Sequence, residues 1–482
     1  MPSFPSFSFE RFQLNSFTRR LTCDGQPVPV ADRHFDVLYR LVSSAGELVT
    51  KDTLVNAGWG DVAVTDNSLE QAISALRRAL GTRADGSQYI ETVPRRGYRF
   101  SGAVERRIAK ASDDDLDAMM APHRAWVEGR AALETLEANQ VGRAIRDFEQ
   151  VLEAFPDNAL AHVGLANAFA MRYETTRADV IPDKESLARA AKHAREACRV
   201  DPGLAEAWAT LGFIHSCQGQ PVEALAALRR GVTMEPDNWR HQFRLAYSSW
   251  GEERLRASRR TLAMLPGFPL AHFLAATVHV ARNLLDEAER ELRAGIVGQD
   301  AQGPHARFTA VALHWLLGLV LLAKGDEEGA VVEFERELAA ESSGHLYSRE
   351  CCANTCYALG SLRLRQGRGM EAQQAFTQAL ERVPNHRLVQ MVLAVPSLAG
   401  MKDTHSLFSR VKGGSFDEMF GGAIAMGLLD QPASAAQAIE SALAEAPPGN
   451  AGWLLPVEPL LNVAANPGIW TPALARLQAR AV

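Results

Sequence analysis

The sequence predicts an α+β domain at residues 1–104, a linker at residues 105–122 and an all-α repeat solenoid at residues 123–482. Three observations carry this prediction. The first part contains short segments of alternating apolar and polar residues. The charge then changes sign from basic to acidic. After that point, helix-pair signatures recur at constant offsets. A chain of 482 residues is also too long for one hydrophobic core, so we expect more than one folded unit.

Composition and net charge narrow the class of protein. A hydrophobic content of 47% and a charged content of 22% describe a globular chain, and a net charge of −6 confines any polyanion-binding surface to a local patch. Six cysteines are too sparse for a disulfide framework. The longest apolar run, Val311–Ala323, is shorter than the ~20 residues of a membrane span. We expect no membrane span, no secretion signal and a cytoplasmic location.

Turn and cap residues locate the first elements. The alternation around Asp24-Gly25 is typical of strands joined by a tight hairpin, and we expect a four-stranded N-terminal sheet. A helix is predicted at Asp32–Ser43, and a second helix begins at the cap-like Thr50. The stretch ETVPRRGYRF, at residues 91–100, predicts a basic hairpin after a turn-rich break.

The third predicted helix begins at Asp66 or Asn67, with Glu70 in position for a capping box. It has an apolar stripe of Leu69, Ile73, Leu76 and Leu80. Its opposite face carries Asn67, Gln71, Ser74 and Arg78, with Arg77 on the flank. Amide and guanidinium groups can hydrogen-bond to base edges, Asn and Gln to adenine and Arg to guanine. The alternative is a solvated helix face that binds nothing.

This order of strands, three helices and a basic hairpin resembles the OmpR/PhoB-type winged helix. The resemblance covers residues 9–100 without a large gap. The form TVPRRGYRF is most similar to the CadC/HilA branch, in which this domain is N-terminal, so we expect no phosphoacceptor domain. The matching segments are RHFDVL at 33–38, AGELV at 45–49, DNSLEQAISALRRALG at 66–81 and YIETVPRRGYRF at 89–100, with Leu54 and Trp59.

The resemblance implies a DNA-binding domain whose third helix enters the major groove. The hairpin would be a wing that reaches a phosphate or the adjacent minor groove, and the loop at residues 58–65 would contact RNA polymerase. Gly97 would permit the wing turn, and Tyr98 would anchor it by packing inward. The DNA-contacting positions would be Asn67, Ser68, Gln71, Ser74, Arg77, Arg78, Thr92, Arg95 and Arg96.

The chain departs from the response-regulator members at some of these positions. Basic residues are common there where this chain has Asn67, Ser74 and Ala75, and an arginine is common in place of Pro94. Sequence preference is therefore not carried over, and phosphate contacts are expected from Arg77, Arg78, Arg95 and Arg96. The local charge agrees, because residues 67–110 contain nine Lys and Arg against four Asp and Glu.

Helix-pair signatures recur beyond the expected linker. Ala224, Leu228, Gly231 and Pro236 reproduce at an offset of 34 the set Ala190, Ala194, Ala197 and Pro202. The period resembles the tetratricopeptide repeat and indicates about eight or nine helix pairs. Gly212 and Ala224 would let two antiparallel helices cross closely, with Trp208, Leu211 and Leu228 filling gaps between units.

Other groups of residues give weaker evidence for a functional site. Cys351, Cys352 and Cys356 could bind a soft metal or sense oxidation, but Cys356 falls in the packing frame of a repeat, which favours buried structural thiols. Four histidines fall at or near packing positions of predicted repeat helices: His162, His215, His272 and His314. No catalytic motif is visible, so we expect no enzyme, no catalytic residue, no cofactor and no metal.

The sequence therefore favours a DNA-binding transcriptional regulator. Its partners would be double-stranded promoter DNA and RNA polymerase, with the repeats binding a protein, a small ligand or another copy of the chain as a homodimer. The alternative is a repeat-based adapter whose winged helix no longer binds DNA. Target genes, activation or repression, and the input signal stay open.

Overall fold

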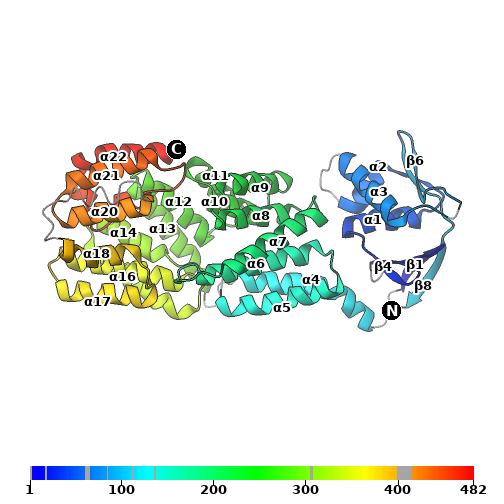
Figure 1. Ribbon diagram of the computed structural model, residues 1–482, viewed down its shortest axis with the longest axis horizontal. Helices are drawn as coiled ribbons and strands as arrows, with labels where there is room; N and C mark the ends of the chain where they lie inside the picture. Colours follow the sequence, from blue (N-terminus) through cyan, green and yellow to red (C-terminus); the bar gives the residue numbers. More distant parts are fainter. Residues whose placement is uncertain are drawn as a thin grey trace. The chain divides into compact units, whose positions relative to one another are not determined.

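The computed structural model describes residues 3–16, 19–59, 66–83, 85–110, 113–134, 137–303, 308–398 and 415–482. The chain forms two compact units. One comprises residues 1–131, 142–169 and 189–211, and the other comprises residues 132–141, 170–188 and 212–482. Between Ser3 and Lys110 the described chain is a mixture of strands and helices, and from α4 onwards it is built of helices and their connections (Figure 1).

An antiparallel sheet of five strands opens the chain. Between β3 and β4, Asp24 (φ 49°) and Gly25 (φ 79°) both occupy the left-handed region, as a two-residue hairpin turn requires. The predicted Asp24-Gly25 turn is therefore confirmed. The strand order is β4-β3-β2-β1-β8, with β1 at Ser3–Phe9, β2 at Phe12–Asn15, β3 at Arg20–Cys23, β4 at Gln26–Val28 and β8 at Glu105–Lys110.

The structure differs from the expected linker at residues 105–122 and from the expected four-stranded sheet. Strand β8 pairs antiparallel with β1 from Ser8↔Glu105 to Ser3↔Lys110, and helix α4 begins soon afterwards and spans Asp113–Glu134. The physical reason lies in the position of β8 at the edge of the sheet. Edge strands often carry charged residues, so a change of charge sign does not exclude a strand.

Three helices and a second sheet complete the N-terminal domain. Thr50 precedes α2, and its Oγ1 accepts a hydrogen bond from the backbone N–H of Thr53 at 3.3 Å, which confirms the predicted cap. The second sheet has the order β5-β7-β6. The bounds are α1 at Asp32–Ser43, β5 at Leu48–Thr50, α2 at Lys51–Trp59, α3 at Asp66–Leu80, β6 at Ile90–Val93 and β7 at Gly97–Phe100.

The core of this domain contains the predicted apolar stripe of α3. Leu69, Ile73, Leu76 and Leu80 are each 1% exposed. Aromatic rings from both sheets also lie in this core, with Phe9 of β1 in edge contact with Phe100 of β7 at 5.0 Å between ring centroids. Burial of this stripe fixes the rotation of α3 about its axis, and the polar face predicted for the same helix is therefore turned away from the core.

The remaining described helices form the repeat region. They include the antiparallel pairs α10/α11, α12/α13, α14/α15, α16/α17 and α20/α21. Short 3-10 turns lie at Ala340–Ser343, Leu455–Val457 and Val463–Ala465. The helix bounds are α5 Ala138–Ala154, α6 Ala159–Thr176, α7 Lys184–Val200, α8 Ala205–Cys217, α9 Pro221–Met234, α10 Trp239–Ser248, α11 Gly251–Met264, α12 Pro269–Ala281, α13 Leu285–Asp300, α14 Leu313–Ala323, α15 Glu327–Ala339, α16 Ser348–Arg365, α17 Gly369–Arg382, α18 Arg387–Leu398, α20 Phe416–Leu428, α21 Pro432–Glu445 and α22 Pro467–Arg480.

Glycine allows the two helices of a pair to cross closely, as predicted for Gly212. A Cβ atom at Gly212 would lie 2.6 Å from Leu228 Cγ and 2.8 Å from the carbonyl oxygen of Ala224. The same arrangement recurs sixteen positions apart in two other pairs. A Cβ at Gly318 would meet the Phe334 ring at 2.5 Å, and one at Gly360 would meet the Phe376 ring at 2.6 Å. The large side chain of the second helix therefore occupies the space that a Cβ on the first would need.

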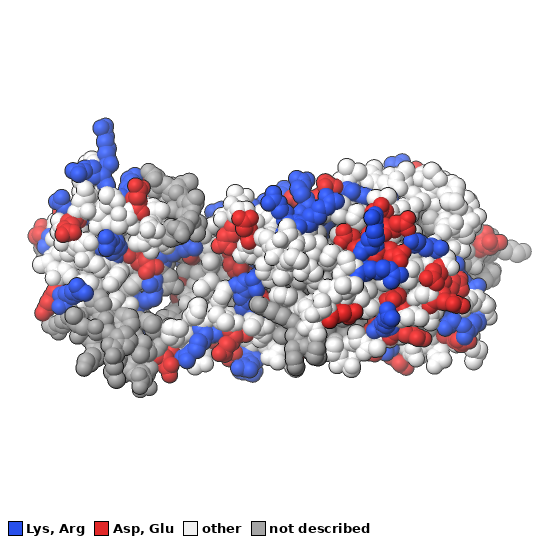
Figure 2. All heavy atoms as spheres, turned by 180° about the vertical axis from the view of Figure 1, so that it is seen from behind, with Lys and Arg blue, Asp and Glu red and all other residues white. Residues whose placement is uncertain are grey.

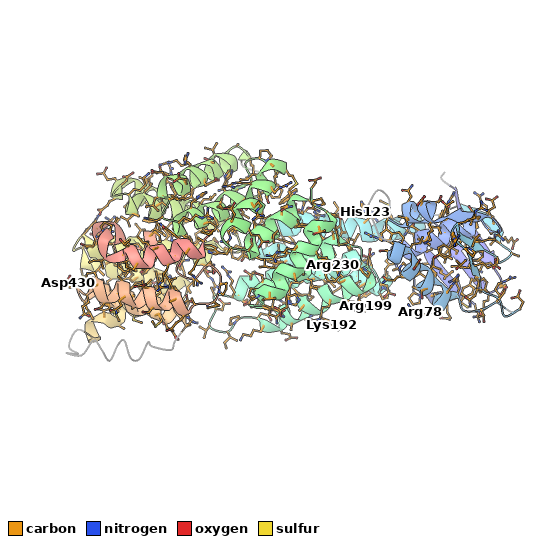
Figure 3. The ribbon with its side chains drawn as sticks, turned by 90° about the horizontal axis from the view of Figure 1, so that it is seen from above. Arg78, His123, Lys192, Arg199, Arg230 and Asp430 are labelled. Atoms are coloured by element: carbon orange, nitrogen blue, oxygen red, sulfur yellow. The ribbon has the colours of Figure 1, made fainter. Side chains whose placement is uncertain are left out.

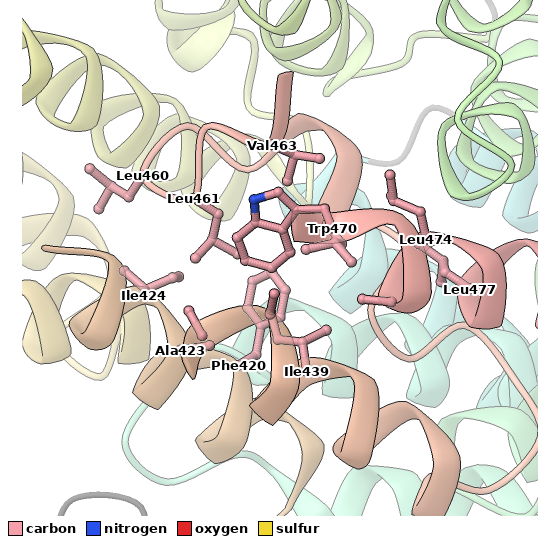
Figure 4. Close-up of a cluster of buried hydrophobic side chains, with 14 of the residues drawn as sticks. Phe420, Ala423, Ile424, Ile439, Leu460, Leu461, Val463, Trp470, Leu474 and Leu477 are labelled. Atoms are coloured by element: carbon pink, nitrogen blue, oxygen red, sulfur yellow. The ribbon is translucent and has the colours of Figure 1, made fainter. Parts of the chain in front are cut away.

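The last helices share a core of their own. Trp470 on α22 is 1% exposed, and Figure 4 shows it facing Phe420 of α20 and Ile439 of α21. Leu460 and Leu461, from the segment between α21 and α22, lie in the same cluster. A large aromatic ring buried among apolar side chains holds these helices together by dispersion and by the area it removes from water.

Ion pairs join residues far apart in sequence within the second unit. Arg177, which follows α6, donates from Nε and Nη2 to Glu350 Oε2 at 3.0 and 2.8 Å. Beside it, Arg349 Nη2 lies 2.5 Å from Asp179 Oδ1. The segment after α6 therefore supplies the cation of one pair and the anion of the other. The Arg177 guanidinium also lies 4.9 Å from the centre of the Tyr347 ring. These contacts tie the turn after α6 to the beginning of α16.

No helix in the described part of the chain combines the length and the apolar character needed to cross a bilayer.

The glycine crossings make a prediction about stability. Gly360→Ala should lower the free energy of unfolding by about 1–3 kcal/mol, because the added methyl group overlaps the buried Phe376 ring. Gly369→Ala is the matched control, since a Cβ there has no neighbour within 4 Å and alanine favours the first turn of α17. Urea denaturation followed by circular dichroism measures both. Equal midpoints for the two variants would contradict this account of the crossing.

Candidate nucleic-acid interface

Helix α3 presents a polar face opposite its buried stripe. Gln71, Ser74 and Arg78 are exposed, and Ser68 is half-buried near the start of the helix. Arg78 is labelled in Figure 3. The backbone of Asn67 belongs to α3, but its side chain lies outside the described residues, as does the predicted capping box. Glu70 instead lies 3.6 Å from Lys51 Nζ. The described side chains at these positions are therefore amide, hydroxyl and guanidinium groups open to solvent.

Arg77 connects α3 to the hairpin that follows. Its Nε and Nη2 donate to the carbonyl oxygen of Ile90 at 3.0 and 2.8 Å, and Nη2 also donates to Thr92 Oγ1 at 2.8 Å. The guanidinium is half-buried between the helix and β6. Two predicted DNA-contacting residues, Arg77 and Thr92, thus bind each other. Sequence reasoning missed this contact, because nothing local in the sequence relates residue 77 to residue 90.

The hairpin of β6 and β7 projects from the domain with basic side chains at its tip (Figures 1 and 2). Arg95 and Arg96 are exposed in the turn, next to the exposed Pro94. Arg95 occupies the left-handed region with φ 63°, and Arg96 N–H donates to the carbonyl oxygen of Val93 at 3.0 Å. The turn residue in the left-handed region is therefore Arg95, whereas the sequence predicted that Gly97 would permit the turn.

Gly97 is required for a different reason. It begins β7 with φ 150°, and a Cβ there would lie 2.1 Å from the carbonyl oxygen of Val49 on β5. Glycine therefore allows β5 to pair closely with β7, opposite Thr50. The next residue, Tyr98, is 5% exposed and packs into the domain core. The wing is thus held at its base by a close strand pairing and a buried ring.

A second contact fixes the chain just before the wing. Tyr89 donates from its hydroxyl to Glu10 Oε2 at 2.6 Å, and Arg83 Nε lies 3.1 Å from Glu10 Oε1. Burial, together with the hydrogen bond to Glu10, raises the pKa of Tyr89 to about 12. The phenol therefore stays protonated and keeps donating at physiological pH.

The remaining predicted site elements lie elsewhere or outside the description. Of the loop at residues 58–65, residues 58 and 59 end α2, and residues 60–65 lie outside the described residues. Cys352 and Cys356 are 1% exposed, and burial raises the pKa of Cys352 to about 12, which disfavours a reactive thiolate. Among the described residues, no group of three or more His, Cys, Asp or Glu side chains is arranged to hold a metal ion.

The predicted repeat histidines bind neighbouring side chains. His272 Nδ1 lies 2.7 Å from Glu291 Oε2, and His314 Nδ1 lies 2.6 Å from Glu333 Oε2. His162 Nδ1 lies 2.9 Å from His193 Nδ1. Each is thus placed within a helix pair or between neighbouring helices.

Comparison with known proteins assigns both parts of the chain. Residues 25–100 match the family described as transcriptional regulatory protein, C terminal, and residues 130–205 and 357–395 match the tetratricopeptide repeat. These are non-enzymatic kinds of domain. Transcriptional regulator HilA of Salmonella typhimurium is 39% identical over 98 residues, which are 20% of this chain and 17% of that protein. Transcriptional activator CadC of Escherichia coli is 32% identical over 82 residues, 17% of this chain and 16% of that protein.

The chain thus spans about a sixth of the length of these curated relatives. The solved DNA-binding domain of Escherichia coli CadC is 27% identical and aligns with 22% of this chain and 98% of that one, with a TM-score of 0.20. The family matches and the two regulators identify the N-terminal region of this chain as an OmpR/PhoB-type transcriptional regulatory domain, homologous to the DNA-binding domains of HilA and CadC, and the helical region after it carries tetratricopeptide repeats.

Proposed function

We propose that this chain is a sequence-specific transcriptional regulator that acts in the cytoplasm on promoter DNA. Helix α3 enters the major groove, and the wing formed by β6 and β7 contacts the phosphate backbone or the adjacent minor groove. One observation carries the proposal. The exposed polar face of α3 and the exposed arginines of the wing belong to two elements that Arg77 joins directly.

The chemistry of the two elements differs. Gln71 and Arg78 can make paired hydrogen bonds to adenine and guanine in the major groove, and Ser74 can bond to either. Arg95 and Arg96 carry charge without a described acidic partner, and they suit phosphates, which position a protein on DNA without reading sequence. Because Arg77 is bound to Ile90 and Thr92, we assign it to positioning the wing.

The repeat region would supply the regulatory input. Tetratricopeptide repeats offer extended surfaces for a protein partner, a ligand or a second copy of the chain. A homodimer is one candidate on these grounds, and RNA polymerase is proposed as the partner of the loop at residues 58–65, as the resemblance implies. Mapping where the protein sits on its genome would identify its target genes.

Removing the wing charges tests the phosphate contacts. Arg95→Ala combined with Arg96→Ala should reduce the slope of log affinity against log salt by about 2, because each phosphate contact contributes about 0.9. The measurement is a titration of the full chain onto a random duplex at several salt concentrations. Arg40→Ala, which removes an exposed arginine at the end of α1, is the control. An unchanged slope in the double variant would show that the wing makes no phosphate contact, and no binding even at low salt would favour the adapter alternative.

A substitution of Gln71 tests whether α3 recognises base edges. Gln71→Ala should change the preferred sequence and cost about 1–3 kcal/mol at one base pair while leaving the salt slope intact. Selection from a pool of randomised duplexes, compared between the wild-type and variant chains, measures the preference. A variant that selects the same sequence as the wild type would show that Gln71 does not contact a base edge.

Variants of two neighbouring arginines test which one positions the wing and which one contacts DNA. The two residues are Arg77 and Arg78. Arg77→Gln should lower the free energy of unfolding of the N-terminal domain by about 1.5–3 kcal/mol, because the bonds from a charged donor to Ile90 and Thr92 are lost. Arg78→Gln should leave stability unchanged and weaken DNA binding, since its side chain is exposed. Hydrogen exchange at the amides of β6 should rise in the first variant alone. Equal exchange in both would contradict the positioning role.

A further inference from the structure

A second set of arginines lies on the repeat region. Basic side chains gather over α9 and α11 in the space-filling view, and the basic residues of these two helices are arginines (Figure 2). Both helices are fully described, and they are joined by an ion pair from Arg229 to Glu253 with two contacts of 2.9 Å. We call the exposed arginines of these two helices the arginine surface, and they are Arg229, Arg230, Arg256, Arg259 and Arg260.

The arginines of α11 form fewer ion pairs with carboxylates than the arginines of α13, α15 and α17 do. Each arginine of α13, α15 and α17 lies within 3.0 Å of a carboxylate oxygen: Arg290, Arg293, Arg336 and Arg382. On α11, by contrast, no described carboxylate forms an ion pair with Arg256 or Arg260, and Arg259 is 3.8 Å from Glu252. Arg256 and Arg260 are one helical turn apart, so two unneutralised charges lie side by side.

A buried charge lies on the same helix. Arg254 on α11 is 7% exposed, and it donates to the carbonyl oxygens of Ala246, Ser249 and Tyr247 and to Thr277 Oγ1 at 2.9 to 3.0 Å. Burial lowers the pKa of Arg254 to about 10, so the group is still protonated at neutral pH. Its partners here are neutral oxygens, and its charge therefore adds to the positive potential of the exposed arginines on α11.

The surface has the composition of a phosphate site. Besides the arginines, the exposed positions of α9 and α11 include the small residues Ala226 and Ala263 and the acidic residue Glu223. α11 exposes no large apolar side chain, and α9 exposes only Val222, in its first turn. A protein interface is expected to centre on a buried apolar or aromatic anchor, whereas phosphate contacts require only charge and close approach. Guanidinium groups in particular match phosphate oxygens in pairs.

We infer that the arginine surface binds the phosphate backbone of duplex DNA, giving the repeat region a DNA contact of its own. The contact reads no sequence, because it involves phosphates alone. It adds to the affinity and to the salt dependence of the whole chain, and Arg256 and Arg260 carry it because their charges are not neutralised within the protein.

The test uses the full chain and a random duplex of about 40 base pairs, titrated at several salt concentrations. Arg256→Gln with Arg260→Gln should reduce the salt slope by about 2 and weaken binding at low salt. Arg256→Lys with Arg260→Lys keeps the charge and should retain most of the slope. The control is Arg290→Gln with Arg293→Gln, which removes two exposed arginines that are paired with Glu287 and Glu289. An unchanged slope in the Gln variant, with its circular dichroism spectrum intact, overturns the inference.

The same variants separate this contact from the wing. Combined with Arg95→Ala and Arg96→Ala, the α11 substitutions should reduce the slope further, since the two sets of arginines act independently. If the wing variant alone changes nothing while the α11 variant still does, the proposed function fails and the arginine surface stands. If poly-glutamate binds in an Arg256- and Arg260-dependent way while DNA binding is unaffected by these substitutions, the surface serves an acidic protein partner and the inference is overturned.

Discussion

Close packing around glycines that have no room for a Cβ atom is the constraint on which both parts of the chain depend. In the repeats, Gly212 and Gly360 face the large side chains of their partner helices, and the helix pairs could not cross as they do with any larger residue. In the N-terminal domain, Gly97 brings β7 against β5 in the same way. The wing and the repeat pairs are thus built around positions where a single methyl group has no room, so their geometry depends on these close contacts in the interior.

Local patterns allowed much of the fold to be predicted. The Asp24-Gly25 turn, the bounds of α1 and the buried stripe of α3 all follow from residues within a few positions of one another. Strand β8 did not follow, because its partner β1 lies about a hundred residues away and its charged residues resemble those of a linker. The bond from Arg77 to Ile90 was hidden for the same reason. Periodicity identifies which face of an element is buried, but it does not reveal which distant element a side chain meets.

Environment distinguishes three of the purposes that arginine serves in this chain. Arg77 is half-buried and bound to backbone oxygen, so it shapes the wing. Arg254 is buried, with all its described bonds made to neutral oxygens, so it fixes the turn between α10 and α11. Arg95 and Arg256 are exposed without a described acidic partner, and these are the groups available to an external anion. A count of basic residues in the sequence treats all of these alike, which is why the surface on α11 emerges only from exposure and pairing.

The ion pairs between the turn after α6 and the start of α16 change how the repeat region should assemble. In a simple solenoid each unit contacts its neighbours alone, so folding can begin anywhere and unfolding can proceed unit by unit. Arg177 and Glu350 are 173 residues apart, and their pairing makes early repeats depend on late ones. During synthesis at the ribosome, the segment around Arg177 must wait for α16 before its partner exists. Such long-range closure slows folding and couples the melting of helices that a linear array would leave independent.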